Sequence, residues 1–421
     1  MTTDLAARYE RVRQRTVDLC KPLTIEDFVV QSMSDASPTK WHLAHTTWFF
    51  ETFVLKAFVP EYRSLNDTYS FLFNSYYVQA GARYVRDRRG LISRPSVQEV
   101  FDYRNYVNSH MMEFLSTSVS NEAEYVIEVG INHEQQHQEL LVTDIKHVLF
   151  ANPLFPKYDT SPHPKSALTP EFRWVEFEEG ITSIGHASIG HTASGFSYDN
   201  ESPVHRQFLE RFALANRPVS NREMLDFIKD GGYENPLHWL SEGWALCQNE
   251  HWRYPFYWIE EDGEWFEFTL YGKIPLDLNA PATHVSYYEA DAYARWAGYR
   301  LPTEFEWEHA SRRAEQETGH YSDRFQFYPI FEDSELPTDL IHMFGSSWEW
   351  TNSHYSPYPG YRAVEGALGE YNGKFMANQF VLRGGSCATP SDHIRSTYRN
   401  FFPASARWQF SSFRLANRLS Q

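Results

Sequence analysis

The chain has 421 residues, of which 42% are hydrophobic and 17% aromatic, and its formal net charge at pH 7 is −17. A chain of this length and composition is long enough to form two globular domains. The negative charge argues against a nucleic acid or an anionic membrane as partner, since either would require a concentrated basic surface. We therefore expect small-molecule partners.

The first residues, MTTDLAARYERVRQRTVDL, alternate charged and apolar side chains in a pattern typical of an amphipathic helix. They lack the continuous apolar stretch of a signal peptide, and no later stretch has the composition of a membrane span. We therefore expect a cytoplasmic protein. The cysteines, Cys20, Cys247 and Cys387, are far apart and odd in number, which indicates free thiols rather than a disulfide framework.

Three further helices are predicted from their start signals. Ser37 can cap a helix that begins at Pro38 and runs through WHLAHTTWFFETFVLKAF. Ser96 and Glu99 form a capping box before VFDYRNYVNSHMMEFL. Asn121 opens a helix that runs through YVIEVGINHEQQHQELLVTDIKHVLF. With the N-terminal helix these segments predict a four-helix bundle, an architecture that builds metal sites between facing helices.

Residues 156–171 are rich in proline and small polar side chains, which breaks both helix and strand and predicts a linker. We expect one domain in residues 1–155 and a second in residues 172–421. The second half is rich in Gly, Trp and Tyr, with short strand-like runs such as FRWVEF and FVLRGG. Two segments, SNREMLDFIKD and SYYEADAYARWAG, have helical patterns. The predicted fold class is therefore α+β in two domains.

His133 and His137 occur four residues apart inside a predicted helix, so both side chains lie on one face and can bind one ion. Together with Glu134 they also match the H-E-x-x-H pattern of zinc peptidases, in which the glutamate is the general base. The helix continues as QELLVTDIKHVLF, without the Gly and His of the metzincin continuation, which counts against a peptidase.

A third imidazole is available on another predicted helix, in the run WHLAH, where His42 and His45 are both candidates. The two lie within one helical turn, so the residues alone do not choose between them. Neutral imidazoles bind Fe, Cu, Ni and Zn alike, so the ligand type leaves the metal open. A lone histidine is usually a surface or core residue, but a pair at this spacing opposite a second histidine-bearing helix favours a metal site.

Tyr76 and Tyr77 fall in the long loop after the WHLAH helix, and functional groups concentrate in loops. A cluster of arginines in an otherwise acidic chain follows them: Arg83, Arg86, Arg88 and Arg89. The cluster is either a solvated loop or a carboxylate clamp, because guanidinium groups bind carboxylates through two hydrogen bonds.

The segments WHLAH and NHEQQHQE resemble the DinB-like helical bundle of the ergothioneine-biosynthetic sulfoxide synthases. The second half is similar to the C-terminal domain of these enzymes, which belongs with the formylglycine-generating enzyme and sulfatase-modifying family and has a C-type-lectin-like core. The motifs that carry the second resemblance are PVSNRE (218–223), GYRLPTEFEWE (298–308), WEWT (348–351), RGGS (383–386) and FRLA (413–416).

The resemblance implies that His45, rather than His42, joins the HEQQH pair and that the metal is iron(II). It implies that Gln136 helps to place the trimethylammonium group of hercynine, the Nα-trimethylated form of histidine. It also implies that Asn400 binds the carboxylate of hercynine. The active site is then expected between the two domains.

Family members that use γ-glutamylcysteine have Trp-Asp after that asparagine, whereas Phe401 and Phe402 follow it here. The acidic element that recognises the γ-glutamyl donor is therefore missing. The cysteine-using branch is similar to this chain in having paired tyrosines in the bundle loop, so the resemblance favours cysteine as the sulfur donor. The family also has a catalytic tyrosine in the C-terminal domain, which the sequence does not locate.

The predicted reaction is an iron- and O2-dependent joining of hercynine to cysteine, or to γ-glutamylcysteine, with oxidation of the sulfur to a sulfoxide. Tyr76 or Tyr77 would donate a proton or hydrogen atom, and Arg83 or Arg86 would bind the donor carboxylate. The alternatives are a homologue that takes a selenium donor, a zinc peptidase and a lectin-like binding protein with a structural metal. Formylglycine generation is not expected, because Cys387 has no paired cysteine nearby.

Overall fold

The computed structural model describes residues 2–192, 195–332 and 339–419. The chain divides into two compact units. The first unit contains Met1–Tyr158, Ile189–Asp199 and Arg362–Gly373, and the second contains Asp159–Ser188, Asn200–Tyr361 and Lys374–Gln421. Two segments that follow the predicted linker therefore belong to the N-terminal unit, which nothing in the sequence pattern indicates.

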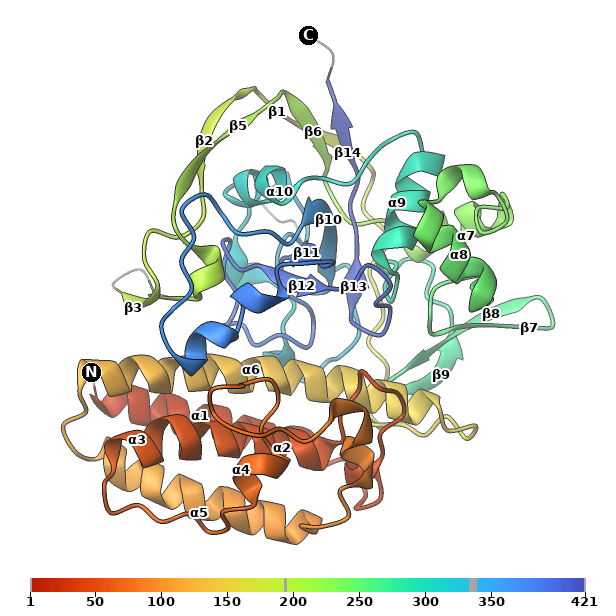
Figure 1. The fold of residues 1–421 in the computed structure, drawn as a ribbon. Coiled ribbons are helices and arrows are strands. Elements are labelled where there is room, and N and C mark those ends of the chain that lie inside the picture. Colours follow the sequence, from red (N-terminus) through yellow and green to blue (C-terminus); the bar gives the residue numbers. More distant parts are fainter. Residues whose placement is uncertain (1, 193–194, 333–338, 420–421) are drawn as a thin grey trace. The chain divides into compact units, whose positions relative to one another are not determined.

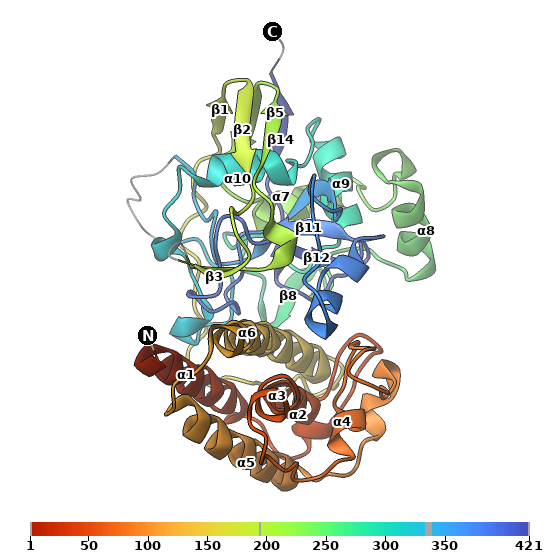
Figure 2. The same cartoon turned by 60° about the vertical axis from the view of Figure 1, so that its left-hand side comes forward.

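Among the described residues of the first unit, four long helices form the expected bundle: α1 (Thr2–Cys20), α2 (Thr39–Phe50), α5 (Val97–Leu115) and α6 (Asn121–Phe150). They lie side by side in both views of the fold (Figures 1 and 2). Helix α2 continues through a π-helical turn (Glu51–Leu55) into α3 (Lys56–Phe58). The loop that follows carries α4 (Tyr69–Leu72) and a 3₁₀ helix (Arg86–Leu91). The segment Ile189–Asp199 adds β3 (Gly190–Thr192), which pairs with β4 (Gly195–Ser197).

The start of α5 agrees with the sequence, since the backbone N–H of Glu99 donates to Oγ of Ser96 and the backbone N–H of Ser96 donates to the Glu99 carboxylate. The start of α6 differs by one residue. Ser120, not Asn121, is the N-cap, and its hydroxyl accepts the N–H of Ala123 at 3.3 Å.

The expected cap at Ser37 is wrong. Pro38 occupies the N-cap position of α2, and its carbonyl accepts the N–H of Trp41 at 2.8 Å. The Ser37 hydroxyl instead accepts a hydrogen bond from Nη1 of Arg89 at 2.9 Å. A tertiary contact has therefore replaced the local one.

Helix α6 is buried along most of its length and packs against α1 and α2. Gly130 allows the close approach of α2, because a Cβ atom there would lie 2.6 Å from Cε1 of Phe50 and 2.9 Å from Cε1 of Phe49. A mid-helix glycine costs about 1 kcal/mol of helix stability relative to alanine. Here it lets two helices meet closely just before His133.

The second unit is an α+β fold built on small sheets. A four-stranded sheet has the order β12 (Asn400–Phe402), β11 (Phe380–Arg383), β10 (Trp348–His354) and β13 (Ser411–Ser412). A three-stranded sheet has the order β1 (Trp174–Phe177), β6 (Phe212–Ala215) and β14 (Ala416–Arg418), and another has β7 (Trp258–Glu261), β8 (Glu264–Thr269) and β9 (Gly272–Pro275). Strand β2 (Gly180–Ile184) pairs with β5 (His205–Leu209).

The helices of this unit are α7 (Asn221–Lys229), α8 (Ser241–Asn249), α9 (Tyr287–Trp296) and α10 (Glu304–Ser311). Helices α7 and α9 confirm the two predicted helical segments, and β1 and β11 confirm the quoted strand-like runs.

The motifs that carry the family resemblance meet one another in the core of the second unit. Nη2 of Arg383 donates to Glu308 at 2.7 Å, which joins RGGS to GYRLPTEFEWE. Nε of Arg414 and Nε1 of Trp307 both donate to Oε2 of Glu349, at 2.6 and 2.8 Å. All five side chains are buried. Four of the five motifs therefore help to hold the core of the second unit together, since removing one partner of a buried ion pair leaves the other charge uncompensated.

The cysteines are free and buried, as expected. The helices in the described part of the chain include none with an apolar stretch of the length needed to span a bilayer.

Candidate metal centre

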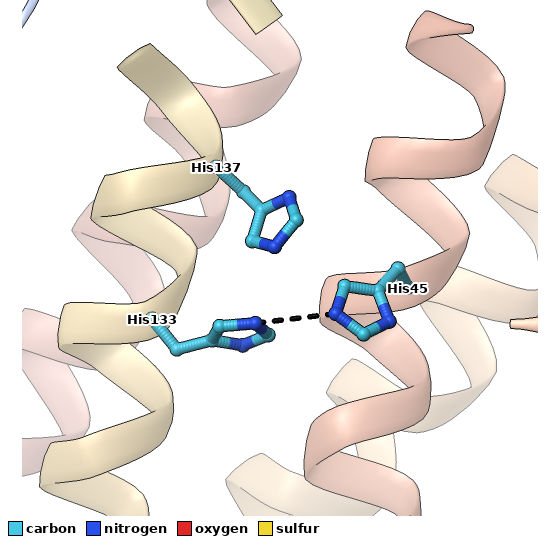
Figure 3. A group of neighbouring side chains, drawn as sticks. All are labelled: His45, His133 and His137. Atoms are coloured by element: carbon cyan, nitrogen blue, oxygen red, sulfur yellow. Dashed lines mark hydrogen bonds between the residues drawn. The ribbon is translucent and has the colours of Figure 1, made fainter. Parts of the chain in front are cut away.

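His45 on α2 faces His133 and His137 on α6, inside the bundle of the first unit (Figure 3). One ligand atom from each side chain lies within 4.8 Å of the others, and all three residues are buried. Nε2 of His45 is 3.2 Å from Nε2 of His133. In the part of the chain that the structure describes, no other group of His, Cys, Asp or Glu side chains has this spacing.

The three imidazoles are held in the neutral form. Burial lowers the pKa of His133 to about 3, although the charge of Glu134 opposes this. Burial, with the charge of His133 as the second cause, lowers the pKa of His45 and of His137 well below the usual range of histidine. Neutral imidazole is the form that donates a lone pair to a metal ion.

Two of the three rings are oriented by hydrogen bonds at their outer nitrogen. Nδ1 of His45 lies 2.6 Å from the carbonyl oxygen of Phe73, which leaves Nε2 for the cluster. Nδ1 of His137 lies 2.9 Å from Nδ1 of His42, so His42 stands behind the cluster and not in it. Three neutral imidazoles, two of them oriented in this way, fit iron(II) and the other divalent transition metals that bind nitrogen.

Glu134 is occupied elsewhere in the bundle. Its carboxylate accepts hydrogen bonds from Nη1 of Arg13 at 2.8 Å, from the Thr16 hydroxyl at 2.6 Å and from Nη2 of Arg104. Burial raises its pKa, but the charges of Arg104 and Arg13 outweigh burial and hold the pKa at about 2. A carboxylate fixed between two guanidinium groups is a structural counter-ion, which counts against a general base for peptide hydrolysis.

The predicted tyrosines lie in the same unit. Tyr77 is buried and packs against Trp48 and Phe53, with ring centroids 5.6 and 5.1 Å apart. Tyr76 stacks on Tyr77 at 4.7 Å. Burial raises the pKa of both phenols, so both keep their proton at neutral pH.

Tyr371 is a site residue that the sequence did not reveal. It belongs to the segment Arg362–Gly373, and its ring centroid lies 5.6 Å from that of His133 and 6.1 Å from that of Tyr76. The neighbouring Glu370 accepts the backbone N–H groups of residues 78 and 79, each at 2.9 Å, which ties this segment to the tyrosine loop. No local pattern marks Tyr371, because its place depends on a return of the chain to the bundle.

The arginine cluster is divided by burial. Arg89 is 5% exposed, with its guanidinium carbon 3.4 Å from the ring centroid of Trp41 and its Nη2 donating to Ser75 at 3.2 Å. Its charge contributes to lowering the pKa of His45 and of His137, after burial and the neighbouring histidines. The remaining arginines of the cluster are exposed: Arg83, Arg86 and Arg88. Nη2 of Arg86 donates to the carbonyl of Asp35 at 2.5 Å.

The residues expected to bind the substrates, apart from the arginines, lie in both units. Gln136 is half-buried on α6, next to His137. Asn400, Phe401 and Phe402 form β12 of the second unit, where Oδ1 of Asn400 accepts the N–H of Phe401 at 2.9 Å. The ring of Phe401 stacks on Tyr355 at 4.1 Å. The roles of these residues stay predictions.

Comparison with known proteins gives the same two parts. The DinB superfamily profile matches residues 8–141, and the profile of the sulfatase-modifying factor enzyme 1-like domain matches residues 175–419. The solved structure of PvdO from Pseudomonas aeruginosa matches 58% of this chain and 94% of its own length at 19% identity, with a TM-score of 0.39. A helical bundle with a histidine cluster, followed by a sulfatase-modifying-factor-like domain, defines the class of this protein.

Similar proteins of known activity define the family more closely. Hercynine oxygenase from Mycobacterium tuberculosis is 29% identical over 98% of both chains. Hercynine oxygenase from Mycolicibacterium smegmatis is 30% identical over 74% of this chain and 76% of its own length. The formylglycine-generating enzyme of Streptomyces coelicolor is 28% identical but matches only 46% of this chain. The chain belongs to the hercynine oxygenase family of non-haem iron enzymes.

Proposed function

We propose that this enzyme uses iron(II) and O2 to join hercynine to L-cysteine and to oxidise the joined sulfur to a sulfoxide. The observation that carries the proposal is the buried cluster of three neutral histidines in a chain of this family. In the balanced reaction the imidazole C–H and the thiol S–H are lost, a C–S bond and an S–O bond form, and the second oxygen atom leaves as water. Iron(II), held by His45, His133 and His137, would supply the activation of O2 and a binding position for the thiolate.

The tyrosines are suited to hold and deliver a proton. Tyr76 and Tyr77 remain protonated at the hydroxyl because burial raises the pKa of each. Tyr371 lies against the His133 ring and is therefore a third candidate for the proton donor. Its position in the sequence does not indicate this role. A hydroxyl that donates a proton during oxygen chemistry would favour the sulfoxide over simple oxidation of the thiol.

The donor carboxylate requires a cation in the first unit. Arg89 is the best supported candidate, because it is buried, it lies over Trp41, and its Nε has no hydrogen-bond partner among the described residues. A guanidinium N–H without a partner can donate a hydrogen bond to a carboxylate oxygen. Arg83 and Arg86 stay sequence predictions for this role, and both side chains are exposed.

The sulfur donor is proposed to be cysteine because Phe401 and Phe402 stand where an acidic recognition element would be expected for γ-glutamylcysteine. Gln136 and Asn400 are proposed to bind the trimethylammonium and carboxylate groups of hercynine. A selenium donor uses the same joining chemistry and is the alternative within the same site.

The test is an anaerobic loading of the protein with iron(II), addition of hercynine and one donor, and admission of O2, with the products identified by mass spectrometry. Parallel reactions contain cysteine, γ-glutamylcysteine or a selenium donor. We expect hercynyl-cysteine sulfoxide only when iron, O2 and hercynine are all present. A protein that yields no hercynine-dependent product with any donor would refute the proposal, and peptide cleavage by the zinc-loaded protein would restore the peptidase alternative.

A further inference from the structure

Behind the histidine cluster, a carboxylate and a second imidazole line up with one of the candidate ligands. Oδ2 of Asp144 lies 3.0 Å from Nε2 of His42, and Nδ1 of His42 lies 2.9 Å from Nδ1 of His137. The same Oδ2 accepts the backbone N–H of Ser37 at 2.8 Å. His42, His137 and Asp144 are each at most 9% exposed. His42 therefore connects a buried carboxylate to a candidate metal ligand.

The antiparallel packing of α2 and α6 produces this alignment. His45 faces His133, and His42, one turn earlier on α2, faces residues further along α6. Asp144 follows His137 by about two helical turns, so both side chains lie on the same face of α6. Both histidines of WHLAH therefore belong to the same site. His45 lies inside the cluster, and His42 lies behind it.

The hydrogen bonds can be assigned only one way if His137 is a ligand. A neutral imidazole carries one N–H, and a ligand that offers Nε2 to a metal carries it on Nδ1. The His137 Nδ1–H must then donate to Nδ1 of His42, so His42 carries its proton on Nε2 and donates to Asp144. The opposite tautomer of His42 would place a proton on the nitrogen that must accept.

We propose that His42 and Asp144 are positioning residues that select the tautomer in which His137 can bind the metal through Nε2. The proposal rests on the metal-binding part of the proposed function and is independent of the substrates. The other two imidazoles lack such support, since His45 contacts a backbone carbonyl and Nδ1 of His133 has no hydrogen-bond partner among the described residues. His137 is therefore the ligand whose outer hydrogen bond a side-chain substitution can remove.

Asp144 and His42 also affect the electronic character of the ligand. An acceptor behind a ligand's N–H increases the basicity of the imidazole, and here the acceptor is itself backed by a carboxylate. A more basic ligand stabilises the more oxidised metal ion. Loss of His42 should therefore weaken metal binding and raise the reduction potential of bound iron.

The experiment compares three variants of the full chain with the wild type: His42→Phe, which removes the acceptor; Asp144→Asn, which removes the charge; and His110→Phe as a control. His110 is on α5 of the same unit, and its Nδ1 lies 2.9 Å from the Tyr106 carbonyl within its own helix. Each protein is titrated anaerobically with Co(II), and the ligand-field absorption of bound Co(II) and the midpoint potential of bound iron are measured.

We expect His42→Phe to weaken Co(II) binding about 10- to 100-fold and to shift the absorption bands and the potential, as outer partners of metal ligands generally do. Asp144→Asn should shift the bands and the potential with a smaller loss of affinity, because an amide oxygen can still accept from Ser37 and His42. His110→Phe should match the wild type. Wild-type affinity, spectrum and potential in a folded His42→Phe protein would overturn the proposal.

A measurement on the unmodified protein covers the case in which His42→Phe does not fold. Nitrogen-15 labelling of the histidines reports the tautomer of each ring in the Zn(II)-loaded protein. We expect the proton on Nδ1 of His137 and on Nε2 of His42, and the reverse arrangement at His42 would overturn the assignment. A wild-type protein that binds neither Co(II) nor Zn(II) would instead refute the metal site itself, which separates the two failures.

Discussion

Nη1 of Arg13 lies 2.8 Å from Oε2 of Glu134 in the interior of the bundle, where Arg104 contacts the same carboxylate from another helix. All three side chains are at most 3% exposed. The residue that resembles a peptidase base is therefore the shared anion of α1, α5 and α6. The residue before it, His133, belongs to the histidine cluster instead.

Glu134→Gln should reduce the free energy of unfolding by about 3 kcal/mol or more, because it leaves two buried guanidinium groups without their counter-ion. Urea unfolding of the full chain measures the change. Glu122→Gln is the matched control, since Glu122 is on the same helix but exposed, and its effect should be within about 0.5 kcal/mol. Equal stability of the Glu134 variant and the wild type would contradict a structural role.

Replacement of the tyrosines by phenylalanine should show which hydroxyl serves the reaction. We expect the responsible variant among Tyr76→Phe, Tyr77→Phe and Tyr371→Phe to form sulfoxide about 100-fold more slowly, the lower range for loss of a general acid. Cysteine sulfinic acid should then become the main product, which mass spectrometry of single reactions detects.

Tyr106→Phe is the control for this series, because Tyr106 is on α5 and its hydroxyl donates to the carbonyl of Arg63. It should leave the product ratio unchanged. If a protein lacking all three hydroxyls still formed the sulfoxide at the wild-type rate, none of these tyrosines would take part.

Arg89→Lys should raise the KM for the sulfur donor about tenfold or more while leaving the KM for hercynine unchanged. Lysine keeps the charge but loses the planar group that lies over Trp41 and the two-bond geometry for a carboxylate. Arg88→Lys is the matched control on the same 3₁₀ helix, where the side chain is exposed. The same measurement on Arg83→Lys and Arg86→Lys tests the original prediction. If the KM for the sulfur donor increased only in those two variants, the exposed arginines and not Arg89 would bind the donor carboxylate.

The features that could be predicted from the sequence are those set by local periodicity. His133 and His137 share a face because of the helical repeat, and the capping box at Ser96 depends on residues three apart. The residue pattern alone did not distinguish His45 from His42 as the third metal ligand, and the family resemblance indicated His45. The structure places His42 behind His137.

Features that depend on long-range packing could not be predicted. Arg89 differs from its neighbours because its guanidinium lies over Trp41 and donates to Ser37 and Ser75, all of which are distant in sequence. Tyr371 approaches His133 only because a segment of the second half belongs to the first unit. Neither contact can be recognised from the spacing of residues or the composition of the sequence. The Ser37 cap was wrong for the same reason, since its hydroxyl is used by Arg89.

A pair of buried histidines in the second unit predicts how stability responds to acid. His342 is 7% exposed, and burial, with the charge of His320 as the next cause, lowers its pKa to about 3. His320 is fully buried, and burial lowers its pKa to about 4. Nε2 of His342 accepts the backbone N–H of Glu332 at 3.3 Å, which requires the neutral ring.

Because the folded pKa of His342 is below the usual value of 6.5, the unfolded chain takes up a proton first as the pH falls. The stability that the neutral ring provides is therefore complete above pH 6.5 and is lost as the pH falls toward 3. Each such group reduces the free energy of unfolding by about 1.4 kcal/mol per pH unit within that window. His342→Asn should make this dependence shallower by about that amount between pH 6 and pH 4.

Urea unfolding at several pH values, followed by tryptophan fluorescence, measures the dependence. His251→Asn is the matched control, because His251 has nearly the same backbone angle, with φ 53° against 52° for His342, but is exposed. Asparagine tolerates this left-handed conformation better than most residues. The control should keep the pH dependence of the wild type. If His342→Asn kept it as well, protonation of this buried ring would not be what limits the stability of the second unit in acid.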